Sequence, residues 1–324
     1  MRAAVYDTSG PTRGVLRLED VPTPDPGPGQ VRVRIEVAGV NPTDIIARRR
    51  GAQAGSTPQI PGQDGAGIID DVGSGVRADR IGERVWLYHA ALEGSGGTAA
   101  EYTCVPEHRA VRLPGSTTFE QGAGLGIPGI TAHRCLFADG PVRGETVLVT
   151  GGAGAVGNLT IQLASSAGAR VLSTVSSEAK AILAEGAGAE VVLRYTEPEL
   201  EARLRAAAPH GIDRVIDVAL AENLATYTDA LAPHASVIAY ARGQHDRVEV
   251  EMHPLLRRNA TLRFVHVYGL SREQLDGAVA DLTEALEAGA LTALPTEGFP
   301  LNRIADAHDL VEHGVTGKVL LEIS

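Results

Sequence analysis

A glycine-rich segment, Gly152-Ala-Gly154-Ala-Val-Gly157, carries the clearest chemistry of the chain. It follows a strand-like run at 146–150 and opens a helix-like run at 155–167, the context in which this spacing binds a dinucleotide. Glycine permits a tight turn at Gly152, approach of a pyrophosphate at Gly154 and close helix–strand packing at Gly157. The free N–H groups of a helix N-terminus attract phosphate. A turn without a ligand is the alternative. The predicted set is Gly152, Ala153, Gly154, Ala155, Val156 and Gly157.

The nucleotide type is predicted from the residues after the second strand-like run, 170–175. NAD enzymes place an acidic residue there to bind the ribose hydroxyls. Here Ser176 and Ser177 follow the strand, and Lys180 adds a cation one helical turn on. Hydroxyl and ammonium donors suit a 2′-phosphate, so we expect NADPH rather than NADH, with Glu178 turned to solvent. A solvated helix start capped by one of the serines is the alternative.

The chain from about residue 123 alternates between strand-like and helix-like segments, which is typical of a doubly wound parallel sheet. Tyr195 follows the third strand and is expected to stack on or bond to the adenosine phosphate, an ordinary half-buried tyrosine being the alternative. Strand-like runs lie at 146–150, 170–175, 191–193, 215–218 and 236–240, with helix-like runs at 155–167, 177–186, 197–208 and 222–231.

The first third of the chain is β-rich. Apolar residues alternate with polar ones over 31–37, which indicates a half-buried strand, and short apolar runs separated by glycines suggest a small barrel-like sheet. We therefore predict two domains. One covers 1–122 and is completed by 266–324; the other covers 123–265.

Composition excludes several classes of protein. The chain has 324 residues, 44% of them hydrophobic, and a formal net charge of −11, which argues against nucleic acid as a partner. No run reaches the length of a membrane span, and the N-terminal residues lack the apolar core of a secretory signal. The two cysteines, Cys104 and Cys135, form no disulfide framework, so we expect a reducing, cytoplasmic setting.

Four further segments, taken in order and spacing, resemble the medium-chain dehydrogenase/reductase superfamily, and within it the zinc-free, zeta-crystallin-like quinone oxidoreductase branch. The resemblance implies a GroES-like catalytic domain, a Rossmann domain and an active-site cleft between them. It also implies NADPH, a small quinone or enone substrate, and a homodimer. The segments are Val37–Asp44, Pro61–Gly67, Gly126–Ala132 and Leu301–Lys318.

The resemblance also assigns roles by position. The neighbours of the nicotinamide fall on Asn41 and Thr131, which become the catalytic candidates. The phosphate loop falls on Ala153–Val156. The contacts to the 2′-phosphate fall on Ser176, Lys180 and Tyr195. Later cofactor segments fall on Asn223, Tyr240, Ala241, Arg242, Val265, His266 and Val267.

The expected substrate pocket departs from the family pattern. Ile46 stands where many members carry a tyrosine, so the identity of the substrate is left open. Zinc-dependent relatives carry a cysteine at the position of Asn41 and a His-Glu pair at the positions of Gln63 and Asp64. A catalytic zinc needs about three cysteine, histidine or carboxylate ligands, so we expect no metal.

Weaker candidates have structural alternatives. His133 could lie near the cleft or be an ordinary satisfied histidine, and Asp44 could orient a proton donor or cap a helix start. The function predicted is NADPH-dependent reduction of a quinone or other conjugated carbonyl without zinc. An enoyl-thioester or enone reductase, and a largely non-catalytic NADPH-binding structural or sensor protein, are the alternatives.

Overall fold

The computed structural model describes residues 1–51, 58–92, 96–245 and 247–323. The chain divides into two units, Met1–Ile127 with Ala293–Ser324, and Pro128–Thr292. The sequence analysis predicted the domain boundaries near residues 122 and 266. In the structure α10 (Arg272–Glu287) belongs to the second unit, where Asp281 accepts a hydrogen bond from His133 at 2.7 Å. A long-range contact of this kind leaves no local trace in the sequence.

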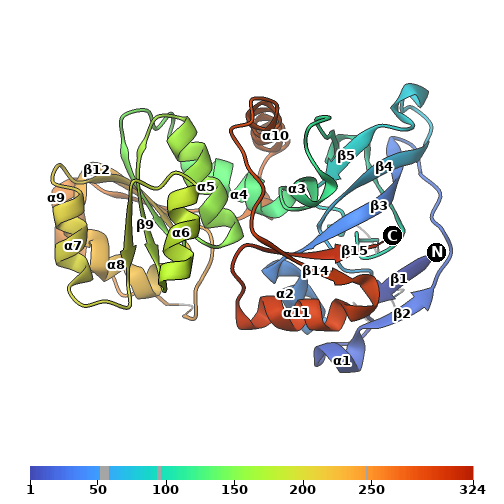
Figure 1. Cartoon of the computed structure of the whole chain (residues 1–324), viewed down its shortest axis with the longest axis horizontal. Coiled ribbons are helices and arrows are strands. Elements are labelled where there is room, and N and C mark those ends of the chain that lie inside the picture. The colour runs from blue at the N-terminus through green and yellow to red at the C-terminus, as the bar shows by residue number, and fades with distance from the viewer. Residues whose placement is uncertain (52–57, 93–95, 246, 324) are drawn as a thin grey trace. The chain divides into compact units, whose positions relative to one another are not determined.

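The second unit contains a six-stranded parallel sheet with the order β10-β9-β8-β11-β12-β13. Figure 1 shows this sheet with helices packed around it. The order reverses between β8 and β11, and ligands of doubly wound sheets bind beside such a switch point, at the carboxyl ends of the strands. The strands are β8 (Thr146–Thr150), β9 (Arg170–Val175), β10 (Val191–Arg194), β11 (Ile212–Asp217), β12 (Leu231–Ala239) and β13 (Thr261–Phe264).

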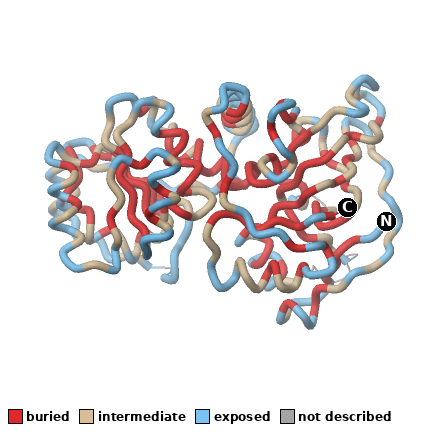
Figure 2. Tube along the Cα trace, in the orientation of Figure 1, coloured by how far each residue is buried: buried red, intermediate tan, exposed pale blue. Residues whose placement is uncertain are grey.

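The helices of this unit follow the strands, as the alternating pattern predicted. The central strands are buried along their length (Figure 2). The helices are α5 (Ala155–Ser166), α6 (Glu178–Gly186), α7 (Leu200–Ala207), α8 (Leu220–Thr228) and α9 (Met252–Arg258).

The first unit contains a sheet with the strand path β14-β15-β3-β4-β5-β7, and β6 also pairs with β3. The alternation over 31–37 gives β3 its buried face: Val31, Val33 and Ile35 are at most 2% exposed. The strands are β3 (Gln30–Val40), β4 (Asp64–Val72), β5 (Arg84–Leu87), β6 (Tyr102–Pro106), β7 (Ala110–Arg112), β14 (Thr296–Pro300) and β15 (Lys318–Glu322); β1 (Arg2–Val5) and β2 (Arg17–Asp20) form a separate antiparallel pair.

The C-terminal strand brings distant residues together. β15 runs antiparallel to β3, with Val319 opposite Val40, so Lys318 lies beside the residue that follows β3, Asn41. The helices of this unit are α1 (Thr12–Val15), α2 (Pro42–Arg50), α3 (Phe119–Ala123) and α11 (Ile304–His313), and the unit boundary falls within α4 (Gly126–Phe137). Short 3-10 turns lie at Ala78–Arg80, Glu107–Arg109, Val267–Gly269 and Leu301–Arg303. Within the described ranges, each helix is too short or too polar to cross a bilayer.

Candidate functional site

The glycine loop joins β8 to α5, and each of its glycines is required for a different reason. The left-handed conformation falls on Gly151, with φ of 69°, rather than on Gly152, to which the sequence assigned the tight turn. A Cβ at Gly152 would lie 2.1 Å from the Ser173 hydroxyl, and one at Gly157 would lie 2.4 Å from the Gly151 carbonyl. A Cβ at Gly154 would meet only that carbonyl, at 3.4 Å. Gly154 therefore keeps its outer side open at the helix N-cap, as a phosphate cradle requires.

The structure brings together three residues predicted to bind the 2′-phosphate. The Ser177 side chain caps α6 by accepting the Lys180 N–H, and the Lys180 ammonium donates to the Ser176 hydroxyl at 3.0 Å. The helix start therefore folds the lysine back to the end of β9. A hydroxyl and an ammonium within one hydrogen bond of each other form a donor group suited to a phosphate.

Two neighbours modify this cluster. Glu178 is bound by Arg194 at 3.0 Å, on the last residue of β10, so its carboxylate has a cationic partner as well as solvent. Tyr195 follows, and its N–H donates to Val175 at the end of β9. The Tyr195 residue is 53% exposed and lines a separate pocket with Glu199 and other residues of the α7 start. Arg194 is a second cation near the serines that the sequence did not single out.

A pocket of about 330 Å³ lies at the carboxyl ends of β12 and β13. It gathers five of the predicted cofactor residues from two separate segments. Its other described lining residues include Leu220, Phe264, His245 and Arg247. The five are Tyr240, Ala241, Arg242, Val265 and His266.

Two predicted cofactor residues lie outside the lining of this pocket. Val267 is 6% exposed and begins a short 3-10 turn. Asn223 donates from its amide to the buried Asp217 carboxylate at 2.8 Å. That carboxylate also accepts from Thr150 at 3.0 Å and from the Tyr227 hydroxyl at 2.7 Å, so it ties the ends of β8 and β11 to α8. The pKa of Tyr227 is raised, chiefly by burial and then by the Asp217 charge.

A buried polar cluster lies in the first unit. The Lys318 ammonium lies 2.6 Å from the Asn41 amide oxygen and 3.1 Å from a carboxylate oxygen of Asp64. The Asn41 amide nitrogen donates to the same Asp64 oxygen at 2.7 Å. All three residues are at most 2% exposed. We call Asn41, Asp64 and Lys318 the lysine triad.

The surroundings of the lysine triad are close-packed. The other Asp64 oxygen accepts the Ile127 N–H at 2.8 Å, in the first turn of α4. A Cβ at Gly126 would lie 2.2 Å from that oxygen, and one at Gly39 would lie 2.8 Å from the Lys318 side chain. Burial raises the pKa of Asp64, although the lysine and the hydrogen bonds oppose that rise. Only glycine at these two positions lets the charges approach.

Asp44 lies one turn into α2 and accepts the Asn41 N–H at 2.8 Å. It therefore serves as part of the helix cap, which was the structural alternative considered from the sequence. Burial raises its pKa to about 7, assisted by the Asp64 charge and opposed by backbone hydrogen bonds and Lys318. A carboxyl group with this pKa changes its charge near neutral pH.

The remaining sequence candidates have varied surroundings. Thr131 is 6% exposed on α4, in the second unit, whereas Asn41 belongs to the first. Ile46 is 45% exposed on α2, and the amide oxygen of Gln63 is buried without a protein partner among the described residues. The His133 imidazole is hydrogen-bonded to the Asp281 carboxylate.

Both cysteines are unreactive by environment. Cys135 is fully buried and Cys104 is partly buried, and burial raises both thiol pKa values, that of Cys104 to about 11. At neutral pH both remain thiols.

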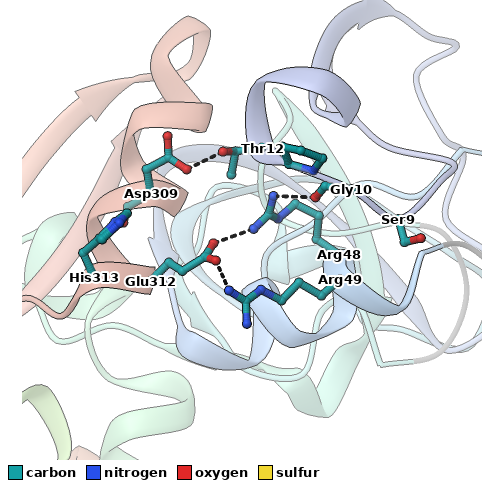
Figure 3. Close-up of a pocket in the computed structure, with 9 residues that line it drawn as sticks. Ser9, Gly10, Thr12, Arg48, Arg49, Asp309, Glu312 and His313 are labelled. Atoms are coloured by element: carbon teal, nitrogen blue, oxygen red, sulfur yellow. Dashed lines mark hydrogen bonds and ion pairs between the residues drawn. The ribbon is translucent and has the colours of Figure 1, made fainter.

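A second pocket, of about 510 Å³, lies in the first unit between the 9–12 segment, the end of α2 and α11 (Figure 3). Its two arginines and two carboxylates already have partners within the pocket. Glu312 binds both Arg48 and Arg49, and Asp309 accepts from the Thr12 hydroxyl. These pairs hold α2 and the N-terminal segment to α11.

Lys318 is the main residue that the sequence reasoning left without a role. One signal was available: Lys180 and Lys318 are the only lysines among 29 basic residues. Its partners are 254 and 277 residues away along the chain, so its contacts could not be inferred locally.

Comparison with known proteins finds a family model that matches part of each unit. Residues 27–115 match the alcohol dehydrogenase GroES-like domain, and residues 155–285 match a domain named zinc-binding dehydrogenase. The chain is 32% identical over 328 residues to the rat quinone oxidoreductase, covering 99% of this chain and 97% of that protein.

Two further relatives extend the comparison. A mycobacterial protein solved in complex with NADPH has a TM-score of 0.85 and 31% identity, covering 99% of this chain and 100% of that one. The tomato 2-methylene-furan-3-one reductase is 37% identical over 210 residues, covering 62% of this chain and 54% of that protein.

Proposed function

Because the chain belongs to the quinone oxidoreductase branch of the medium-chain dehydrogenase/reductase superfamily, we propose that it reduces a quinone or another conjugated carbonyl with NADPH and without zinc. It is a quinone oxidoreductase-like enzyme with a GroES-like domain and a doubly wound nucleotide-binding domain. The substrate, the metal independence and the roles of single residues are the proposal.

The observation that carries the choice of NADPH is the hydrogen bond from Lys180 to Ser176. It holds a cation and a hydroxyl where the second strand ends, next to the open glycine loop. The acidic residue of this segment, Glu178, is bound to Arg194 instead of standing free at the strand tip. The donors therefore fit a 2′-phosphate, and the relative solved with NADPH supports the same cofactor.

Bound NADPH would supply a hydride from its nicotinamide ring to the acceptor. The chain's own residues bind the cofactor and orient the reactants. The glycine loop and the first N–H groups of α5 hold the pyrophosphate, and the pocket residues Tyr240 to Arg242 with Val265 and His266 border the cofactor. Asn41 and Thr131 are the residues that position the nicotinamide and the acceptor. The proton that completes reduction of the acceptor comes from water.

Zinc independence rests on the chemistry of the lysine triad. The positions at which zinc-dependent relatives carry a cysteine and a His-Glu pair hold Asn41, Gln63 and Asp64 here. The Asn41 amide and the Asp64 carboxylate already bind the Lys318 ammonium. A positive charge about 3 Å from both groups repels a second cation. Within the described ranges, His, Cys, Asp and Glu side chains form no group of three suited to a metal. A zinc ion does not fit here.

The test is turnover of NADPH with a panel of quinones and enones in buffer treated with a chelator. We expect oxidation of NADPH with at least one conjugated acceptor, and no change when zinc is added back. Failure with every acceptor would leave the chain as a cofactor-binding protein, the non-catalytic alternative, which still predicts tight NADPH binding.

Reduction of an isolated enone is the second candidate. The tomato 2-methylene-furan-3-one reductase supports it, although that relative covers 62% of this chain. The same panel separates the two: preference for an enone over a quinone by more than tenfold in kcat/KM would favour this alternative.

We also propose that two copies associate through β13. This strand ends the six-stranded sheet, and its residues Leu262 and Phe264 are exposed, as are Met252 and Leu256 on α9. Exposed apolar side chains along a sheet edge are a recognised site for pairing with another strand. Light scattering should give twice the mass of 33.8 kDa for the native chain and the single mass for Phe264→Glu.

The location proposed is the cytoplasm, with no membrane or nucleic-acid partner. Two cysteines whose thiols stay protonated suit a reducing compartment. The net charge of −11 disfavours binding to nucleic acid.

A further inference from the structure

The lysine triad determines which way the Asn41 amide points. The group facing the amide at 2.6 Å is an ammonium, which has donors and no acceptor. The amide atom in contact with it must therefore be the oxygen. On the other side a carboxylate oxygen of Asp64 faces the amide nitrogen at 2.7 Å. The two charged neighbours fix one orientation, because a flipped amide would set donor against donor and acceptor against acceptor.

This orientation limits what Asn41 can offer a ligand. The amide nitrogen carries two hydrogens, and Asp64 accepts one of them. The second N–H has no acceptor among the described residues that contact Asn41, and the residue is 2% exposed. A buried donor of this kind costs free energy unless an acceptor reaches it.

We propose that Lys318 is a positioning residue that makes Asn41 an obligatory hydrogen-bond donor, directed at a carbonyl oxygen of the bound ligands. This inference rests on the proposed function. Conjugated carbonyl acceptors gain negative charge on oxygen as they are reduced, and a fixed N–H donor stabilises such charge. The carboxamide oxygen of nicotinamide offers the same chemistry, so the test must distinguish the two.

The first experiment measures steady-state turnover of NADPH with 1,4-naphthoquinone. The double variant Lys318→Met with Asp64→Asn removes both charges together and leaves no unpaired ion, so the amide can take either orientation. We expect kcat/KM to fall about 10- to 100-fold, the size of one hydrogen bond to a charged group, with little change in melting temperature. A fall of less than twofold would overturn the proposal.

A matched control removes a comparable ion pair elsewhere. Arg214 is 4% exposed and binds Glu145 at 3.1 Å, in the second unit. Arg214→Met with Glu145→Gln should leave kcat/KM within about twofold of the native value. An equal fall in both double variants would assign the loss to general destabilisation and overturn the proposal.

The second experiment observes the Asn41 side-chain amide directly by NMR and needs no turnover. The chain has five asparagines, so labelling them with ¹⁵N gives few side-chain signals, and Asn41→Ser identifies the one of interest. NADP⁺ with 1,4-naphthoquinone forms a complex that cannot react. A shift of one Asn41 proton with NADP⁺ alone identifies the carboxamide as acceptor, and a shift only after the quinone is added identifies the substrate. No shift at either step would overturn the proposal.

A third variant covers the case in which the double variant does not fold. Lys318→Arg keeps a side chain with donors only, so the orientation is retained. We expect kcat/KM within about fivefold of the native enzyme and the same proton shift. Loss of the shift in a folded Lys318→Arg protein would contradict the role given to the ammonium. Turnover by the native enzyme tests the proposed function separately.

Discussion

The chain's two lysines lie in opposite environments, one in each unit of the chain. Lys180 is partly exposed, and its partners Ser176 and Ser177 are at most four residues away. Lys318 is 2% exposed, and its partners Asn41 and Asp64 are more than 250 residues away. Lys180 therefore makes local contacts, and Lys318 makes buried contacts between segments that are distant in the sequence.

The difference has an energetic consequence. An exposed ammonium is solvated whether or not it has a partner, so losing it changes binding more than folding. A buried ammonium has given up its water, and its partners depend on it. The predictions below test this contrast from the largest expected effect to the smallest.

Substitution of the buried lysine should have the largest effect on stability. Lys318→Ala leaves Asp64 buried without its cation, which typically costs about 3–5 kcal/mol. Lys180→Ala should change stability by less than about 0.5 kcal/mol. Urea unfolding of the two variants at neutral pH measures both. A similar loss in the two would mean that burial does not separate the lysines.

The carboxyl group next to the lysine triad should make stability depend on pH. The pKa of Asp44 is raised to about 7 because the side chain is buried. The folded state therefore keeps a proton that the unfolded state loses near pH 4, so stability falls as pH rises from about 4 to 7 and then levels off. The full effect is up to roughly 4 kcal/mol.

Asp44→Asn should remove this pH dependence. The comparison of native and variant unfolding free energies at several pH values isolates Asp44 from the nearby Asp64 and Lys318, which both proteins share. A native protein that becomes more stable than the variant as pH rises through this window would reverse the sign and contradict the assignment.

Substitution of the partly exposed lysine, Lys180, should change cofactor affinity. Lys180→Ala is expected to weaken NADPH binding by roughly 5- to 50-fold, since one hydrogen bond to a charged phosphate is lost. NADH binding should be unchanged because it lacks that phosphate. Fluorescence titration of both cofactors gives the dissociation constants. Equal effects on the two, or a native preference for NADH, would show that the end of β9 does not bind the phosphate.

The smallest effect is expected at the acidic neighbour of the same cluster. Glu178 is bound to Arg194, so Glu178→Gln removes a negative charge near Ser176, while Arg194 keeps its ion pair with Glu197. NADPH should bind about two- to fivefold more tightly, and the gain should vanish at high salt because the pair is exposed. Arg194→Gln, the matched control, should give no gain.

The sequence predicted the second unit well because its signals are local. The strand and helix pattern and the glycine spacing lie within short segments, and the sheet has the order expected of a doubly wound fold. Even there the left-handed residue of the loop was Gly151 and not Gly152, where a Cβ would instead meet Ser173 on the neighbouring strand. A contact from another strand cannot be inferred from the spacing of glycines.

In the first unit, the sequence did not predict the contacts that bring Lys318 to Asn41 and Asp64. The resemblance placed Asn41 and Asp64 at the site, yet gave Lys318 no part in it. The alternation along β3 was visible, but its pairing with β15 was not. That pairing decides the location of the lysine, and it depends on strands that meet only after the chain has folded.

What the sequence determined by itself is therefore the local pattern: a glycine loop between a strand and a helix, and a strand end that carries hydroxyls and a cation. Only the tertiary structure decided which of the polar groups are buried and how they are paired. It closed β15 against β3, excluded water from Lys318, and so fixed the Asn41 amide between an ammonium and a carboxylate. The physical reason is that burial and the pairing of distant charges depend on which surfaces meet, and residue type alone does not specify this.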